Sequence, residues 1–203
     1  MINLLIAEDQ AMLLTTLASL LNLEDDINVV HQSKDGRDAL EFLLDQSNPK
    51  VDILLTDIEM PQLTGIELIQ AIRANKLAIK SIVLTTFSRA GYLRRAMDAG
   101  VKGYLLKDSP SDELLSAIRK IASGGKVIAA ELMQDAWMEL DPLTDKERKA
   151  LQLAKDGAST EQIAEQLHLS AGTVRNYLSS ACSKLNAKNR VEAARIAHQN
   201  GWL

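Results

Sequence analysis

Carboxylates stand at the ends of apolar, strand-like runs in this sequence. The stretch DILLTDIEMP (52–61) has the pattern of a buried strand, yet it includes Asp57 and then Glu59. A similar run at the N-terminus ends in Glu8 and Asp9. Clustered carboxylates repel one another unless a cation neutralises them, and Mg²⁺ binds one or two carboxylates together with waters and phosphate oxygens. Phosphoryl chemistry at a metal ion is therefore the first hypothesis for these acids.

A hydroxyl group and an ammonium group stand at the ends of two further runs. SIVLTT (81–86) carries Thr85 near its end, and KGYLL (102–106) is followed by Lys107. With a metal beside it, Asp57 could act as a nucleophile toward phosphorus, and Lys107 could pair with the incoming phosphoryl oxygens. Thr85 could donate a hydrogen bond to another of these oxygens.

These residues predict a metal site in which each acid has a role. We expect Asp9 and Asp57 to bind Mg²⁺ (or Mn²⁺) directly and Glu8 to bind it through water. The backbone carbonyl of Glu59 could supply a further protein oxygen. Each residue alone is more often an ordinary strand end or surface group, so the prediction depends on their meeting at one edge of a sheet.

The hydrophobic pattern indicates the elements that must bring these residues together. Apolar runs lie at 3–7, 27–31, 52–56, 81–86 and 102–106, and amphipathic stretches lie at 10–22, 36–46, 65–75, 90–98 and 111–122. Parallel strands need crossover helices, which cover both faces of the sheet. The pattern therefore predicts an α/β domain with a five-stranded parallel sheet, whose ligand site lies at the carboxyl ends of the strands.

The end of the α/β region and the start of the tail are marked by helix signals. In DSPSDE (108–113), Ser109 is expected to cap the last helix and Pro110 to be its first residue. Past Pro142 the pattern becomes purely helical and favours four helices. Two capping-box spacings support this interpretation, Thr144 with Glu147 and Ser159 with Gln162.

We therefore expect an α/β domain at 1–122, a linker at 123–142 and an all-α domain at 143–203. A short helix carrying Trp137 could form within the linker. Residues 1–140 carry 14 basic and 20 acidic side chains, whereas residues 141–203 carry 9 and 7. An acidic body with a slightly basic tail indicates different partners for the two parts.

Composition excludes several classes of protein. No apolar run approaches the roughly 18 residues of a membrane span, and the N-terminus lacks the pattern of a signal peptide. We expect no membrane insertion and a cytoplasmic location. Cys182 is the only cysteine, so an internal disulfide or a cysteine cluster for zinc is impossible.

The residues at the strand ends resemble those of the receiver domain of bacterial two-component response regulators. The resemblance covers residues 1–122 and implies a flavodoxin-like sheet with strand order 2-1-3-4-5. It implies that Glu8 and Asp9 bind the metal, that Asp57 is phosphorylated, and that Lys107 binds the phosphoryl group. Thr85 and Tyr104 would be the switch hydroxyl and the switch aromatic residue. Asp108 departs from the pattern, since many receivers have proline there.

The tail resembles the LuxR-type helix-turn-helix of the NarL/FixJ group of response regulators. The resemblance rests on Glu147, Gly157, the pair Ile163-Ala164 and the pair Thr173-Val174. The stretches IAEDQAMLL and GVKGYLLKDSPSDEL most resemble the sequences of DesR-like regulators of membrane-lipid genes. This resemblance implies that the third helix of the tail reads DNA.

Helical spacing divides that third helix into a buried stripe and a polar face. The buried stripe is expected to hold Val174, Tyr177, Leu178, Ala181 and Leu185. Arg175 can address guanine or phosphate, Asn176 can pair with adenine, and small hydroxyl residues permit close approach to a major groove. The candidate DNA contacts are Thr173, Arg175, Asn176, Ser179, Ser180, Ser183, Lys184, Lys188 and Arg190.

The leading hypothesis is a transcription regulator that receives a phosphoryl group on Asp57 from a sensor histidine kinase. We expect a homodimer when the protein is phosphorylated, with Val191 and Ala194 of the last helix packing against a second copy on DNA. The other partners are promoter DNA and, for an activator, RNA polymerase. Phosphate on Asp57 would draw Thr85 inward, and Tyr104 would follow.

Two other functions compete with this hypothesis. A phosphatase could use Asp57 as its nucleophile and Glu59 as a general acid, although the stretch TDIEMP lacks the Asp-x-Asp-x-Thr pattern of such hydrolases. Alternatively, the α/β domain could serve only for dimerisation of a DNA-binding protein. Turnover of phosphate esters would favour the phosphatase, and the complete acid pair argues against the dimerisation module.

Overall fold

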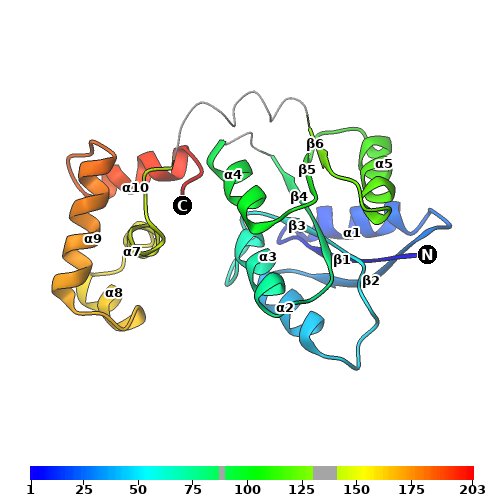
Figure 1. The fold of residues 1–203 in the computed structure, drawn as a ribbon, viewed down its shortest axis with the longest axis horizontal. Coiled ribbons are helices and arrows are strands. Elements are labelled where there is room, and N and C mark those ends of the chain that lie inside the picture. The colour runs from blue at the N-terminus through cyan, green and yellow to red at the C-terminus, as the bar shows by residue number, and fades with distance from the viewer. Residues whose placement is uncertain (87–89, 130–140) are drawn as a thin grey trace. The chain divides into compact units, whose positions relative to one another are not determined.

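The computed structural model describes residues 1–86, 90–129 and 141–203 and forms two compact units, which we describe separately (Figure 1). The first is the α/β unit and the second, after residue 140, is all helical. The helix expected around Trp137 lies outside the described residues. In the described part of the chain, no helix has the length and hydrophobicity needed to cross a membrane.

The α/β unit is built on a parallel sheet. Its strands are β1 (Ile2–Ala7), β2 (Ile27–Ser33), β3 (Ile53–Asp57), β4 (Lys80–Thr85), β5 (Gly103–Leu106) and β6 (Val127–Ile128). Their order is β2-β1-β3-β4-β5-β6, and every neighbouring pair is parallel. The predicted parallel α/β fold and the order 2-1-3-4-5 are confirmed. The two residues of β6 were not predicted to be a strand, and the sheet thus continues into the stretch assigned to the linker.

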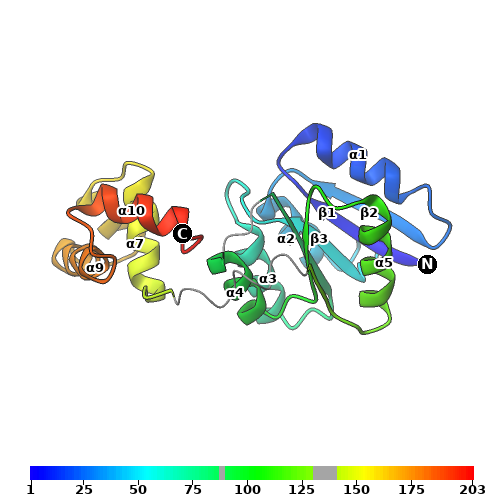
Figure 2. The ribbon, with the colours of Figure 1, turned by 90° about the horizontal axis from the view of Figure 1, so that it is seen from above.

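Helices cover both faces of the sheet, as crossover connections require. They are α1 (Ala11–Leu21), α2 (Gly36–Leu44), α3 (Gly65–Ala74), α4 (Ala90–Ala99) and α5 (Ser111–Ala122). Helices α1 and α5 lie on one side of the sheet, and α2, α3 and α4 lie on the other (Figure 2). Because side chains alternate along a strand, Leu4, Ile6 and Leu55 face α1 and α5 and form a continuous core with them.

Cap residues fix where the helices next to the sheet edge begin. Thr64 and Glu67 form a complete capping box at the start of α3. The prediction for α5 was wrong by one residue, since the helix begins at Ser111 and Pro110 is its N-cap. The Pro110 carbonyl accepts hydrogen bonds from the amides of Glu113 and Leu114, no cap side chain accepts a hydrogen bond, and Ser109 lies outside the helix.

The second unit contains the four helices expected from the sequence. They are α7 (Asp145–Lys155), α8 (Thr160–Gln166), α9 (Ala171–Lys184) and α10 (Arg190–Gln199). Both predicted capping boxes are present, at the starts of α7 and α8. Ser170 caps α9, because its side chain accepts a hydrogen bond from the Thr173 amide.

The core of the second unit is formed by apolar side chains from all four helices. Val174, Leu178, Ala181 and Leu185 of the predicted stripe are buried, and Tyr177 is half-buried at its edge. The expectation for Ala194 was wrong, because it is 4% exposed and packs in the core of its own unit. Val191 is 72% exposed.

Candidate functional site

Three of the predicted acids come together at the carboxyl edge of the sheet. Glu8 and Asp9 follow β1, Asp57 ends β3, and these two strands are neighbours. One carboxylate oxygen from each of the three residues lies within 4.8 Å of the others. Glu8 and Asp57 are buried, whereas Asp9 is exposed. The strand order thus brings two distant segments of the sequence, Glu8-Asp9 and Asp57, into one acidic cluster.

Lys107 brings the predicted positive charge to this cluster. Its Nζ lies 2.7 Å from Glu8 Oε2 and 2.9 Å from Asp57 Oδ2. Its position is fixed by β5 and by a backbone hydrogen bond from the Lys107 amide to the Thr85 carbonyl. The departure from proline at Asp108 therefore leaves the lysine in contact with the Asp57 carboxylate.

Burial and charge act on these groups in opposite directions. Burial raises the pKa of Glu8 and of Asp57, and this effect exceeds the lowering by hydrogen bonds and charge from Lys107. The Ile58 amide donates to Asp57 Oδ1 at 2.6 Å. The Lys107 pKa is raised, because its bonds to Glu8 and Asp57 outweigh its burial. Three carboxylates against one ammonium leave an excess of negative charge.

The cluster fits a hard divalent cation. All candidate ligand atoms are carboxylate oxygens, which Mg²⁺ prefers, and a doubly charged ion would neutralise the excess charge. The side chain of Glu59 is exposed. The role of its backbone carbonyl as a ligand stays a prediction.

Removal of one negative charge at Asp9 tests the metal site. Asp9→Asn is expected to raise the Kd for Mg²⁺ about tenfold or more, because an amide oxygen replaces a carboxylate in the cluster. Titration calorimetry measures this constant. Asp25→Asn is the matched control, since Asp25 is exposed and changes the net charge equally. An equal rise in both variants would mean that only the overall charge of the protein matters.

Thr85 and Tyr104 lie on the neighbouring strands β4 and β5 and are both buried. Thr85 ends β4, at the same edge as Asp57, and Tyr104 pairs in register with Val83. The structure shows one arrangement of these side chains. Their coupled movement on phosphorylation stays a prediction.

Gly65 is a residue of this site that sequence analysis missed. It begins α3 after the loop that follows Asp57, and its amide donates to the Ile58 carbonyl at 2.9 Å. A Cβ at this position would lie 1.9 Å from the Asp57 carbonyl oxygen. The glycine therefore lets helix α3 approach the backbone of Asp57, and the dipeptide TG at 64–65 was its only local signal.

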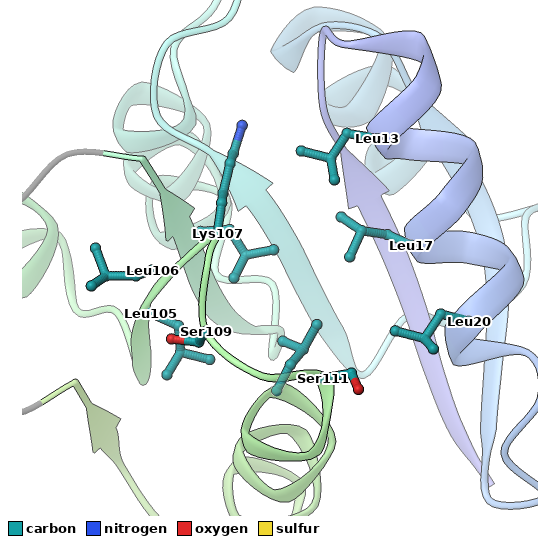
Figure 3. Close-up of a pocket in the computed structure, with 10 residues that line it drawn as sticks. Leu13, Leu17, Leu20, Leu105, Leu106, Lys107, Ser109 and Ser111 are labelled. Atoms are coloured by element: carbon teal, nitrogen blue, oxygen red, sulfur yellow. The ribbon is translucent and has the colours of Figure 1, made fainter.

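A small apolar pocket lies beside the acidic cluster, between α1 and α5 (Figure 3). Leu13, Leu17 and Leu20 project from α1 toward the end of β5 and the start of α5. The pocket encloses about 160 Å³. The stem of Lys107 contributes to its lining, while the ammonium group contacts the acids.

Helix α9 presents the predicted polar face. Arg175, Asn176 and Ser179 are exposed on it, and Lys188 and Arg190 are exposed just after it. Thr173, in the first turn of α9, is partly exposed, and its hydroxyl lies 2.9 Å from the Ser170 hydroxyl. Ser183 is exposed, and its hydroxyl donates to the Ser179 carbonyl.

Two predicted DNA contacts, Ser180 and Lys184, bind a buried acid of their own unit, and their contact with DNA stays a prediction. The Ser180 hydroxyl donates to Glu147 Oε1 at 2.6 Å, and Lys184 Nζ donates to Glu147 Oε2 at 2.7 Å. The sequence could not show this contact, because Glu147 is more than thirty residues away along the chain. These two side chains therefore have a task inside the helical unit.

Each of the two parts of the chain matches a known protein family. Residues 4–119 match the family described as "Response regulator receiver domain", and residues 141–197 match "Bacterial regulatory proteins, luxR family". The chain is a response regulator of the NarL/FixJ type. The acidic cluster of this response regulator lies in its receiver domain, and α9 lies in its LuxR-type DNA-binding domain.

Known relatives match this response regulator along nearly the whole of both chains. The response regulator is 49% identical to "Transcriptional regulatory protein DesR" of Bacillus subtilis (strain 168), over 100% of both chains. The solved structure of response regulator ChrA from a heme-sensing two-component system is 32% identical, with a TM-score of 0.55, and covers 100% of this chain and 98% of that chain. RcsB of Salmonella enterica serovar Typhimurium, bound to promoter rprA with the phosphomimetic BeF3-, is 25% identical, with a TM-score of 0.74 and coverage of 98% and 99%. The nearness to DesR-like regulators is thereby confirmed.

Proposed function

We propose that Asp57 accepts a phosphoryl group from a sensor histidine kinase and that this modification activates binding of promoter DNA by a homodimer. The observation that carries the proposal is the contact of Lys107 with both Asp57 and Glu8 in a cluster of three acids. This arrangement provides a nucleophile, a cation for the phosphoryl oxygens and ligands for a metal in one place.

The chain's own residues account for the transfer. A carboxylate oxygen of Asp57 forms the new bond to phosphorus, and the bond from phosphorus to the donor, a kinase histidine nitrogen or the acetate of acetyl phosphate, breaks. After transfer, the Lys107 ammonium group pairs with the negatively charged phosphoryl oxygens, and Thr85 donates a hydrogen bond to one of them. When bound by Glu8, Asp9 and Asp57, Mg²⁺ supplies the charge that lets the acids and the phosphoryl group approach each other.

The second step is DNA reading by the helical domain. Arg175 and Asn176 on the exposed face of α9 form hydrogen bonds with the edges of bases in a major groove. Lys188 and Arg190 contact phosphates. A single small domain makes few contacts, so two copies on paired half-sites are needed for strong binding. Val191 of α10 is an exposed apolar residue and is available to contact a second copy.

The buried residues Thr85 and Tyr104 couple phosphorylation to DNA binding. Their rearrangement would alter the receiver surface that pairs with a second copy. The kinase and DNA as partners imply a cytoplasmic site of action, with RNA polymerase as a further partner if the protein is an activator. The resemblance to DesR-like regulators makes promoters of membrane-lipid genes the first DNA to test. The matched domains are those of regulators, which favours this function over a phosphatase.

Arg175→Ala tests the DNA-reading face. The affinity for a specific duplex is expected to fall about tenfold or more, because a good contact to a base edge is worth about 1–3 kcal/mol. Fluorescence anisotropy with the phosphorylated protein measures this affinity. Arg195→Ala on α10 is the control, since it removes the same charge from an exposed position outside α9. Equal affinities for the Arg175 variant and the wild type would argue against α9 as the recognition helix.

A further inference from the structure

Glu147 is the one charged side chain that is buried among the described residues of the DNA-binding domain, with 4% of its surface exposed. A carboxylate removed from water is costly unless it is hydrogen-bonded and paired with a cation. The hydrogen-bond partners of Glu147 therefore indicate the role of this buried charge in the domain.

One set of partners lies at the start of its own helix. The Thr144 amide donates to Glu147 Oε2 at 2.7 Å, and the Glu147 amide donates to Thr144 Oγ1 at 3.3 Å. This is a capping box, which a glutamine completes equally well. The neighbouring helix α8 has such a box with Gln162. Helix capping alone therefore does not require a negative charge at position 147.

The other set of partners lies on the recognition helix. Ser180 and Lys184 are four residues apart and therefore share one face of α9. Each donates to a different oxygen of Glu147, at 2.6 and 2.7 Å. Burial raises the pKa of Glu147, but the hydrogen bonds from Lys184, Ser180 and Thr144 outweigh it and lower this pKa to about 2. The carboxylate is thus charged throughout the pH range in which proteins bind DNA.

The hydrogen bonds of Glu147 depend on direction, whereas the apolar packing of the domain core does not. Contacts of Val174, Leu178 and Ala181 hold α9 against the domain, but apolar packing is non-directional. Hydrogen bonds have narrow ranges of distance and angle. The buried stripe of α9 determines which face points inward, and two hydrogen bonds from one face of α9 to a carboxylate on α7 narrow the remaining rotation of α9 about its axis. That rotation decides where Arg175 and Asn176 point.

We propose that Glu147 is a positioning residue for DNA recognition, which acts through Ser180 and Lys184 on the orientation of α9. The proposal rests on the proposed function, because it takes α9 as the helix that reads DNA. It assigns Lys184, whose side chain is 34% exposed, to the hydrogen bonds around Glu147 and leaves Lys188 and Arg190 as the phosphate contacts.

The test compares specific with non-specific binding by full-length, phosphorylated variants. One probe is a duplex selected by the wild type from a random-sequence pool, and the other is a scrambled duplex of the same composition. Glu147→Gln keeps the capping box but removes the charge that holds Lys184, and Lys184→Met removes the cation. Both are expected to lower the ratio of the two affinities about tenfold, and Lys184→Arg is expected to restore most of it.

Lys188→Met is the matched control, because Lys188 is exposed and its loss removes an ordinary phosphate contact. It should weaken binding to both duplexes about equally and reduce the slope of log affinity against log salt by about one. If Lys184→Met changes both affinities and the slope in this same way, Lys184 is itself a phosphate contact and the positioning role of Glu147 is overturned.

A milder variant keeps the test informative if the stronger ones do not fold. In Lys184→Gln the amide can still donate to Glu147 Oε2, and we expect an unchanged salt slope with a two- to threefold lower affinity ratio. A ratio equal to that of the wild type, or a slope reduced by about one, would overturn the proposal. A wild type that selects no duplex at all would instead remove the DNA-reading function on which the proposal rests.

Discussion

Asp57→Asn protein incubated with Mg²⁺ and acetyl phosphate should carry no phosphoryl group, whereas the wild type should approach one group per chain. The reason is chemical, because the amide of asparagine is a poor nucleophile and cannot form the acyl phosphate that a carboxylate forms. The geometry supports a single acceptor, since Lys107 contacts Asp57 Oδ2 at 2.9 Å and the Ile58 amide holds Oδ1 at 2.6 Å.

Intact-protein mass spectrometry measures the stoichiometry, and treatment with base identifies the adduct, since an acyl phosphate is stable to acid and labile to base. Asp25→Asn is again the control and should be phosphorylated like the wild type. A base-labile adduct that persists in Asp57→Asn would move the acceptor to another residue. Release of many equivalents of phosphate from phosphate esters would favour the phosphatase hypothesis.

Gly65→Ala should damage both the stability and the phosphorylation of the receiver domain. The new Cβ would lie 1.9 Å from the Asp57 carbonyl oxygen and 2.9 Å from Thr56 Oγ1. The first of these is a backbone atom of the sheet, so α3 or the end of β3 must move. Overpacking of this kind costs about 1–3 kcal/mol, and a shift of β3 also moves the Asp57 carboxylate relative to Lys107.

Chemical denaturation followed by circular dichroism measures the lost stability, and the rate of phosphorylation measures the shift of the site. Gly172→Ala is the matched control, because Gly172 is also in the first turn of a helix and its Cβ would meet only Ser170 Oγ, at 3.6 Å. That control should be neutral or slightly stabilising, since alanine favours the helix. Equal stability of the two variants would show that the approach of α3 to Asp57 is not tight.

The sequence predicted the receiver site because its residues occupy the ends of strands. A buried strand that ends in a carboxylate breaks the apolar pattern, and parallel topology gathers such ends at one edge. Glu8, Asp9, Asp57 and Lys107 could therefore be assigned to one cluster before the structure was known, and the structure brings them together. The boundaries of β1–β5 and α1–α5 were predicted to within one or two residues, because the hydrophobic pattern changes where each element ends.

The remainder could not be predicted because it depends on contacts between distant residues. The two residues of β6 are too short to give a strand pattern, and their pairing with β5 follows only from the path of the chain after α5. Glu147 was recognised as a capping residue, but its bonds to Ser180 and Lys184 join different helices. Ala194 carried an apolar pattern that fits a dimer contact as well as a core.

We propose that phosphorylation of Asp57 controls DNA binding, and a binding assay measures this control. The affinity of the full-length protein for a selected duplex is determined by fluorescence anisotropy with Mg²⁺, with and without acetyl phosphate, for the wild type and for Asp57→Asn. Control of DNA binding by phosphorylation predicts that the phosphodonor increases the affinity of the wild type about tenfold or more and leaves the affinity of the variant unchanged. Equal affinity of the wild type under both conditions, or an equal increase in the variant, would contradict it.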